Sequence, residues 1–215
     1  MRLFLASHDF GDHKKELLEL MGAGRKALVI ANARDFCPSD ERVSVVSKKM
    51  EIMKRAGIEA KELDLRKYFD KEDELAAFIN AYGPDLIYAI GGNVFLLSTA
   101  YRLSGFDKIV LKNLEQDKYV YGGGSAGAMV TADTLKYYGH DSLVPEAVLG
   151  VYGVEAVLDG LGLINEYIIP HADVLDCLEA TRIFQERMRS DGIEGFLLNQ
   201  LSAIIVEEGK MAVLP

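Results

Sequence analysis

The residues best suited to chemistry lie in a glycine-rich run at positions 119–130, which reads Tyr-Val-Tyr-Gly-Gly-Gly-Ser-Ala-Gly-Ala-Met-Val. Gly123, Ser125 and Gly127 match the G-x-S-x-G pattern, in which a serine occupies a tight turn between a strand and a helix. Its neighbours must be small, because larger side chains would collide with the strand and the helix. Such a turn exposes the serine hydroxyl and directs the backbone N–H groups that follow it toward a developing oxyanion. The pattern therefore predicts Ser125 as a nucleophile.

The same glycines permit two other interpretations. Gly122, Gly124 and Gly127 fit G-x-G-x-x-G, a dinucleotide-binding fingerprint, so a nucleotide-binding oxidoreductase is one alternative. That fingerprint normally follows the first strand of its unit and precedes an acidic residue at the end of the next strand. Here four candidate strands come earlier, and no acidic residue ends a clear strand at the required distance. The other alternative is a glycine-rich turn whose serine is inert.

A nucleophilic serine needs a base, and the sequence contains four histidines. His171 follows the apolar run Tyr-Ile-Ile-Pro, so we expect it to emerge from the end of a strand and to reach across the sheet toward the serine. The histidines at 8, 13 and 140 lie in a first loop, a charged helical stretch and a polar turn. The alternative is that His171 only caps a loop. A serine followed by histidine with little chain remaining differs from the order of an ordinary α/β-hydrolase.

The surrounding sequence alternates between short apolar runs and helical patterns. Strands are expected at 3–6, 27–31, 58–65, 86–90 and 119–121, and amphipathic helices at 43–53, 75–82 and 94–101. This alternation predicts a parallel sheet with helices on both faces, whose ligands bind at the carboxyl ends of the strands. The informative loops then follow Ala6, Ala31, Ile90 and Tyr121. The segments 195–198, 201–206 and 211–214 are expected to add short strands as an antiparallel edge or hairpin.

Composition restricts the class of protein. The 215 residues contain no repeat or linker, which predicts a single domain over 1–215, and 49 % apolar residues exclude overall disorder. A net charge of -9 argues against nucleic acid or an anionic membrane as a partner. Cys37 and Cys177 form no disulfide framework, and no apolar run reaches the ~18 residues of a membrane span. We therefore expect a cytoplasmic protein. No ligand-like spacing implies a metal or an organic cofactor.

Four short segments are informative together: Ile90-Gly91-Gly92-Asn93, Gly124-Ser-Ala-Gly-Ala128, Ile169-Pro-His171 and Thr181-Arg182. On these residues, and over most of its length, the chain resembles the peptidase family of aspartyl dipeptidase (peptidase E) and cyanophycinase. The resemblance implies a class I glutamine amidotransferase-like fold. This is a three-layer α/β sandwich, similar to flavodoxin, with a mostly parallel central sheet and helices on both faces. It also implies a serine hydrolase acting on short peptides, on a fold where homodimers are common.

The resemblance assigns roles to individual residues. Ser125 is the implied nucleophile, and His171 the implied base and later acid. The N–H groups of Ala126 and of the Gly91-Gly92 turn, which Asn93 closes, are the implied oxyanion hole and substrate contacts. Arg182 resembles the basic residue that holds an acidic substrate side chain, which makes dipeptides with an acidic first residue candidate substrates. The helical spacing of Leu175, Leu178 and Arg182 is compatible with an inward-facing arginine. The alternative is an arginine exposed to solvent on the surface, as charged residues usually are.

The third member of a catalytic triad departs from the family pattern. Where the dipeptidase has a glutamate, residues 196–202 contain no carboxylate, and Gln200 or Asn199 falls nearest. Asp173 stands two residues after His171, the spacing of the His-x-Glu pair in glutamine amidotransferases, and is our predicted third member. Asp141 is a further acidic candidate. The absent glutamate favours another alternative, a catalytically weak or inactive amidotransferase-like protein that serves in binding or stress response.

Overall fold

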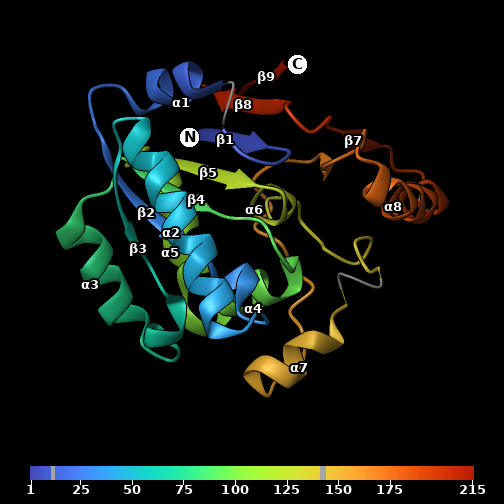
Figure 1. Cartoon of the computed structure of the whole chain (residues 1–215), viewed down its shortest axis with the longest axis horizontal. Helices are drawn as coiled ribbons and strands as arrows, with labels where there is room; N and C mark the ends of the chain where they lie inside the picture. Colours follow the sequence, from blue (N-terminus) through green and yellow to red (C-terminus); the bar gives the residue numbers. More distant parts are fainter. Residues whose placement is uncertain (11–12, 141–143) are drawn as a thin grey trace.

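The computed structural model describes residues 1–10, 13–140 and 144–215, whose strands form a seven-stranded sheet and a separate two-stranded sheet (Figure 1). In spatial order the large sheet contains β3 (Glu59–Glu62), β2 (Lys26–Ile30), β4 (Leu86–Ala89), β5 (Val120–Gly124), β1 (Arg2–Ala6), β8 (Ala203–Glu207) and β9 (Lys210–Leu214). The first five strands run parallel, while β8 pairs antiparallel with β1 and with β9. The prediction of a mostly parallel central sheet is confirmed.

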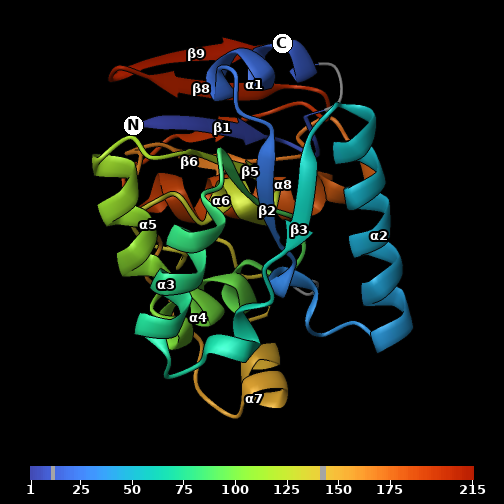
Figure 2. The same cartoon turned by 90° about the vertical axis from the view of Figure 1, so that its left-hand side faces the viewer.

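Helices cover both faces of this sheet (Figure 2). One face packs against α1 (Lys14–Met21) and α2 (Ser39–Arg55), and the other against α3 (Glu72–Tyr82), α4 (Val94–Ser104) and α5 (Phe106–Glu115). The remaining helices are α6 (Ala126–Met129), α7 (Glu146–Tyr152) and α8 (Leu178–Ser190), with 3-10 turns η2 (Asn32–Arg34), η3 (Leu65–Tyr68) and η4 (Leu175–Cys177). No helix in the described part of the chain is both long and apolar enough to cross a membrane.

Apolar residues of the central strands are buried on both faces, as their continuous apolar runs predict. In β4, Ile87 packs into the core beneath α3, α4 and α5, and Tyr88 into the core beneath α1 and α2. The structure extends β5 through the glycines, so the sharp turn comes at Ser125 rather than at Gly122–Gly124 as expected. Gly122 is needed for packing between strands and not for a turn, because a Cβ on it would lie 2.6 Å from the ring of Tyr88.

The C-terminal strands were only partly predicted. The hairpin of β8 and β9 is confirmed, but Gly195–Leu197 forms β7, which pairs in parallel with β6 (Tyr167–Ile169) in the two-stranded sheet. The pairing continues past the strand ends, because Leu198 N–H donates to Ile169 O at 2.9 Å and Ala172 N–H donates to Leu198 O at 3.0 Å. This small sheet places the chain after residue 169 beside the chain before β8.

Candidate active site

The turn between β5 and α6 holds Ser125 in a strained backbone conformation. Its φ is 51° and its ψ is -111°, values that cost a residue with a side chain free energy and persist only where the surroundings impose them. A Cβ on Gly123 would lie 2.2 Å from Gly127 O, and one on Gly127 would lie 2.2 Å from Ala89 O. The Ser125 N–H donates to Ala6 O at 3.0 Å, which ties the turn to β1. The G-x-S-x-G spacing therefore has a packing reason at both glycines.

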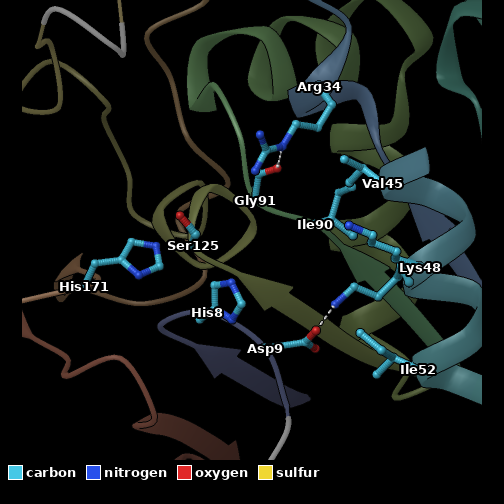
Figure 3. Close-up of a pocket in the computed structure, with 11 residues that line it drawn as sticks. His8, Asp9, Arg34, Val45, Lys48, Ile52, Ile90, Gly91, Ser125 and His171 are labelled. Atoms are coloured by element: carbon cyan, nitrogen blue, oxygen red, sulfur yellow. Dashed lines mark hydrogen bonds and ion pairs between the residues drawn. The ribbon is translucent and has the colours of Figure 1, made fainter. Parts of the chain in front are cut away.

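His171 follows β6 and faces the same cavity as Ser125 (Figure 3). Its φ of 60° is also unusual for a residue other than glycine, and its backbone N–H donates to Oγ of the buried Ser7 at 2.7 Å. This bond joins the end of β1 to the loop that carries the imidazole. Within the described residues the imidazole does not hydrogen-bond Ser125 directly; such contacts often tighten only when substrate binds.

A glutamine, not an aspartate, contacts the far side of the imidazole. Oε1 of Gln200 lies 2.5 Å from Nδ1 of His171. The expectation that Asp173 orients the ring is wrong, because its Oδ1 instead accepts the backbone N–H of Gln200 at 2.6 Å. Asp173 thus holds the loop whose side chain reaches the ring. Asn199 is exposed and bonds through its backbone carbonyl to Ser202, and Asp141 lies outside the described residues.

The surroundings favour the neutral form of the imidazole. Burial lowers the pKa of His171 below its usual 6.5, and the neighbouring His8 lowers it further. The hydrogen bond to Gln200 and the charge of Asp173 act in the opposite direction but are outweighed by burial. The rings of His8 and His171 meet edge to face with their centroids 5.9 Å apart. A neutral imidazole at physiological pH can accept the proton of a serine hydroxyl.

The predicted oxyanion-hole glycines border the nucleophile. Gly91 lines the cavity, and a Cβ on it would lie 2.9 Å from Cβ of Ser125, so no larger residue fits there. Gly92 has a φ of 152°, and a Cβ on it would lie 2.2 Å from Ala33 O. Ala126 follows Ser125 directly and is buried. Gly91, in the loop after β4, and Ala126, at the start of α6, thus both border Ser125.

Asn93 has a structural task in this arrangement. Its Oδ1 accepts the backbone N–H groups of Phe95 at 2.9 Å and Leu96 at 3.1 Å, which caps the first turn of α4. Its backbone N–H donates to Ala33 O at 2.8 Å. Asn93 therefore anchors the glycine turn between β4 and α4, and it is not among the residues that line the cavity.

The cavity has a volume of about 240 Å³. Its wall contains several polar side chains that the sequence did not identify individually. Besides Ser125 and His171, its polar side chains are His8, Asp9, Arg34 and Lys48, which Figure 3 labels, and Lys49. Three of them follow β1 or β2, in loops that the sequence marked as informative. The two lysines come from α2, where no sequence signal pointed to a site.

The cationic groups of the cavity differ in their partners. Lys49 is buried and its Nζ lies 2.6 Å from Oδ2 of Asp9, while burial lowers its pKa. Lys48 is exposed at the rim. Nε of Arg34 donates to Gly91 O at 2.7 Å. Because Asp9 is already paired with Lys49, Arg34 and Lys48 give the cavity a positive character within an acidic protein.

Arg182 lies elsewhere, and the expectation that it faces inward is wrong. Its side chain is 55 % exposed and pairs with Glu179 at 2.7 Å and with Glu186 on the surface of α8. The predicted stripe faces solvent, since Leu175 is 83 % and Leu178 45 % exposed. The buried face of α8 consists of Thr181, Phe184 and Met188. Leu175 belongs to η4, which precedes the helix, so its spacing to Arg182 is not that of one continuous α-helix.

Within residues 1–10, 13–140 and 144–215, no group of three or more His, Cys, Asp or Glu is placed to hold a metal ion.

Comparison with curated proteins finds two relatives, both from Listeria. The uncharacterized peptidase Lin0382 of Listeria innocua is 30 % identical over 133 residues, which cover 61 % of this chain and 58 % of the relative. The uncharacterized peptidase Lmo0363 of Listeria monocytogenes is 34 % identical over 88 residues, 40 % of each chain. The chain therefore aligns with less than two thirds of the length of either relative.

Solved structures with the same fold cover nearly the whole chain. A candidate peptidase E protein from Listeria monocytogenes EGD-e superposes with a TM-score of 0.76 at 21 % identity, covering 99 % of this chain and 97 % of the other. A peptidase from an acI-B1 actinobacterium gives 0.70 at 18 % identity, covering 99 % and 86 %. The class I glutamine amidotransferase-like fold class is thereby confirmed. The sequence profile of peptidase family S51 matches residues 4–214, and the chain belongs to this family, the one that its motifs resemble.

Proposed function

We propose that the protein is a serine peptidase that hydrolyses short peptides, with Ser125 as nucleophile and His171 as base. Oγ of Ser125 attacks the carbonyl carbon of the scissile bond while its proton moves to Nε2 of His171. Backbone N–H groups of Gly92 and Ala126 stabilise the negative oxygen of the tetrahedral intermediate. The imidazolium gives its proton to the leaving amine. Water, deprotonated by the same imidazole, then releases the acid and restores the serine.

The observation that carries this proposal is the strained turn at Ser125 in one cavity with His171. Positive φ at a serine is costly and is found where the surrounding structure requires it, often at catalytic sites. Here the two flanking glycines and the bond to Ala6 enforce it. An inert turn would have no need to direct a hydroxyl at a cavity that contains an imidazole of lowered pKa.

Gln200 takes the orienting role in this proposal. Accepting the Nδ1–H of His171 leaves Nε2 as the lone-pair nitrogen, which is the tautomer that a base requires. A neutral amide stabilises the imidazolium less than a carboxylate does, so we expect slow turnover compared with a Ser-His-acid enzyme. Asp173 keeps Gln200 in place through its backbone N–H. The same amide is the observation that favours the second candidate, a weakly active or inactive binding protein.

The size and charge of the cavity support short, acidic substrates. A volume of about 240 Å³ suits a few residues rather than a protein chain. Arg34 and Lys48 on its wall attract a carboxylate, whereas Arg182 is paired with two glutamates on the surface. We therefore propose dipeptides with an acidic first residue as the preferred class, recognised by Arg34 and Lys48.

Labelling and hydrolysis test the two candidates. A fluorophosphonate probe should modify wild-type protein at Ser125, and the variants Ser125→Ala and His171→Ala should not be labelled at an appreciable rate. A panel of Asp-X, Glu-X and Leu-X dipeptides should be cleaved by wild type, Asp-X and Glu-X fastest, and not by Ser125→Ala. Absence of both labelling and hydrolysis in folded wild type would refute the peptidase proposal and support a binding protein. Labelling together with cleavage of Leu-X alone would refute the acidic preference.

A further inference from the structure

One hydrogen bond connects a wall of the cavity to the glycine turn beside the nucleophile. Nε of Arg34 donates to Gly91 O at 2.7 Å, which joins the loop after β2 to the loop after β4. In Figure 3 the carbonyl of Gly91 points to the guanidinium of Arg34, and Ser125 lies on the other side of Gly91. The contact is partly buried and lies at the edge of the cavity that contains Ser125.

The direction of that carbonyl decides where the next N–H group points. The bond between Gly91 and Gly92 is trans, because the described chain has no cis peptide, and in a trans peptide the C=O and N–H point in opposite directions. Fixing Gly91 O on Arg34 therefore directs the Gly92 N–H away from Arg34, toward the side of Ser125. Within the described residues, neither glycine N–H donates a hydrogen bond to another protein group.

From this geometry we propose that Arg34 is a positioning residue for the oxyanion hole, which it serves by holding the Gly91–Gly92 peptide. The inference rests on the proposed peptidase function. Two consecutive glycines have more conformational freedom than any other pair, and a turn of their shared peptide would point a carbonyl oxygen at the developing oxyanion. The guanidinium opposes that turn, and its charge polarises the peptide so that the Gly92 N–H becomes a stronger donor.

The loop that carries Arg34 is itself rigidly held. Asp35, the next residue, has a fully buried carboxylate that accepts from Nε of Arg42 at 2.7 Å and from the hydroxyl of Tyr152 at 2.6 Å. Asn32 binds the same carboxylate through Nδ2 at 2.7 Å. These contacts occupy the neighbouring acid, and no carboxylate of the described chain forms an ion pair with Arg34. Its guanidinium is thus available to the glycine carbonyl.

The loop after β2 and the loop after β4 pack closely against each other beside the Gly91–Gly92 peptide. The backbone N–H of Asn93 donates to Ala33 O at 2.8 Å, and a Cβ on Gly92 would lie 2.2 Å from the same oxygen. The glycine turn is therefore in contact with η2 directly after the peptide that Arg34 holds. Among the residues that the structure describes, Arg34 is the charged residue that hydrogen-bonds Gly91 O.

Steady-state kinetics on a neutral substrate separate positioning from charge attraction. We would compare wild type, Arg34→Ala and Arg34→Lys on 4-nitrophenyl acetate, with Arg25→Ala as control. Nη1 of Arg25 donates to Gly22 O at 2.7 Å, a similar arginine–glycine bond at the opposite end of β2. Loss of an oxyanion-hole donor lowers kcat about 10²-fold, so we expect up to that loss in Arg34→Ala, a smaller one in Arg34→Lys, and none in Arg25→Ala. KM should stay within about threefold, because the ester carries no charge.

Two further readouts test the role of Arg34. The first separates loss of the guanidinium group from misfolding, and the second does not require turnover. Added guanidinium ion should restore at least part of kcat in Arg34→Ala and nothing in Ser125→Ala. The order parameter of the Gly92 amide, measured by NMR, should fall from ~0.85 toward ~0.6 in Arg34→Ala and stay unchanged in Arg25→Ala.

The outcomes separate this inference from the peptidase proposal. An effect of Arg34→Ala on KM alone, or an unaltered Gly92 amide in both Arg34 variants, would overturn the positioning role even in an active enzyme. Wild type without turnover or probe labelling would overturn the peptidase proposal. In that case the amide measurement still decides whether Arg34 holds the peptide.

Discussion

Oε1 of Gln200 lies 2.5 Å from Nδ1 of His171, so a neutral amide occupies the position next to the imidazole. The amide can select the tautomer of the ring but offers no negative charge to an imidazolium. Its own position depends on Asp173, whose carboxylate accepts the Gln200 backbone N–H at 2.6 Å. Asp173, the acid that the sequence suggested as a partner of the ring, thus contacts Gln200 and not the ring itself.

Gln200→Glu should speed the reaction and change its pH dependence. A carboxylate beside Nδ1 stabilises the imidazolium, so we expect kcat to rise by about tenfold or more. Replacing the aspartate of a Ser-His-Asp triad by an amide lowers kcat ~10⁴-fold, so a rise of this size lies within the range that such an acid can supply. It should also raise the pKa of His171, which burial now holds below 6.5. The acidic limb of kcat/KM against pH should therefore move to higher pH than in wild type. Profiles between pH 4 and 9 measure this, and coinciding limbs for the two proteins would contradict it.

Ser125→Gly should be more stable than Ser125→Ala, although both lack the nucleophile. Alanine retains the Cβ that makes a φ of 51° costly, whereas glycine adopts this conformation freely. We expect a difference of about 1 kcal/mol in the free energy of unfolding, the lower end of what such strain costs. Urea denaturation of the two variants measures it. Equal midpoints would show that the turn is not strained.

Gly123→Ala should strongly disrupt the nucleophile turn. Its Cβ would lie 2.2 Å from Gly127 O, and a backbone atom cannot move aside as a flexible side chain can. We expect a loss of about 3 kcal/mol or more in unfolding free energy, or failure to fold. Gly150 in α7 is a matched control with nothing within 4 Å of a new Cβ, so Gly150→Ala should be neutral or stabilising by up to about 1 kcal/mol. Similar thermal midpoints for both variants would contradict the packing argument.

Asp9→Asn should destabilise the protein, because it leaves the buried charge of Lys49 without its partner. Lys49 is buried next to the ring of Tyr88, and its Nζ lies 2.6 Å from Asp9. Removing one partner of a buried pair costs about 3 kcal/mol, whereas replacing both can be nearly neutral. The double variant Asp9→Asn with Lys49→Met should therefore recover most of the stability lost in the single variant. Additive losses in a double-mutant cycle would argue against the ion pair as the cause.

Lys48→Ala should reduce the preference for acidic dipeptides, and Arg182→Ala should not. Lys48 borders the cavity, while the Arg182 guanidinium is paired with Glu179 and Glu186 on the surface of α8. The ratio of kcat/KM for Asp-X over Leu-X measures the difference. We expect it to fall about tenfold in Lys48→Ala, the scale of one charged contact to a substrate. A fall in Arg182→Ala instead would assign the carboxylate contact to α8.

Local spacing predicted the parts of the site that depend on local packing. Gly123 and Gly127 must be glycines because backbone atoms occupy the space of their side chains, so their spacing identified Ser125. The strand-end rule also predicted loops that line the cavity, since Ser125, Gly91, Arg34 and His8 follow β5, β4, β2 and β1. Both signals arise from backbone geometry, which short segments of sequence encode well.

The sequence named both Asp173 and Gln200 as candidate partners of His171 but could not decide between them, because the choice depends on loop geometry far along the chain. Asp173 and Gln200 are 27 residues apart, and the pairing of β6 with β7 brings their segments together. The error at Arg182 has a different origin. The spacing of Leu175 and Leu178 suggested a buried stripe, but both leucines face solvent.

The bond from the backbone of His171 to Ser7 spans 164 positions of sequence, and β8 pairs with β1. A nascent chain that has left the ribosome only as far as α7 contains the serine turn but neither the imidazole nor its amide partner. The proposed active site can therefore form only after the C-terminal segment has been synthesised and has docked beside β1.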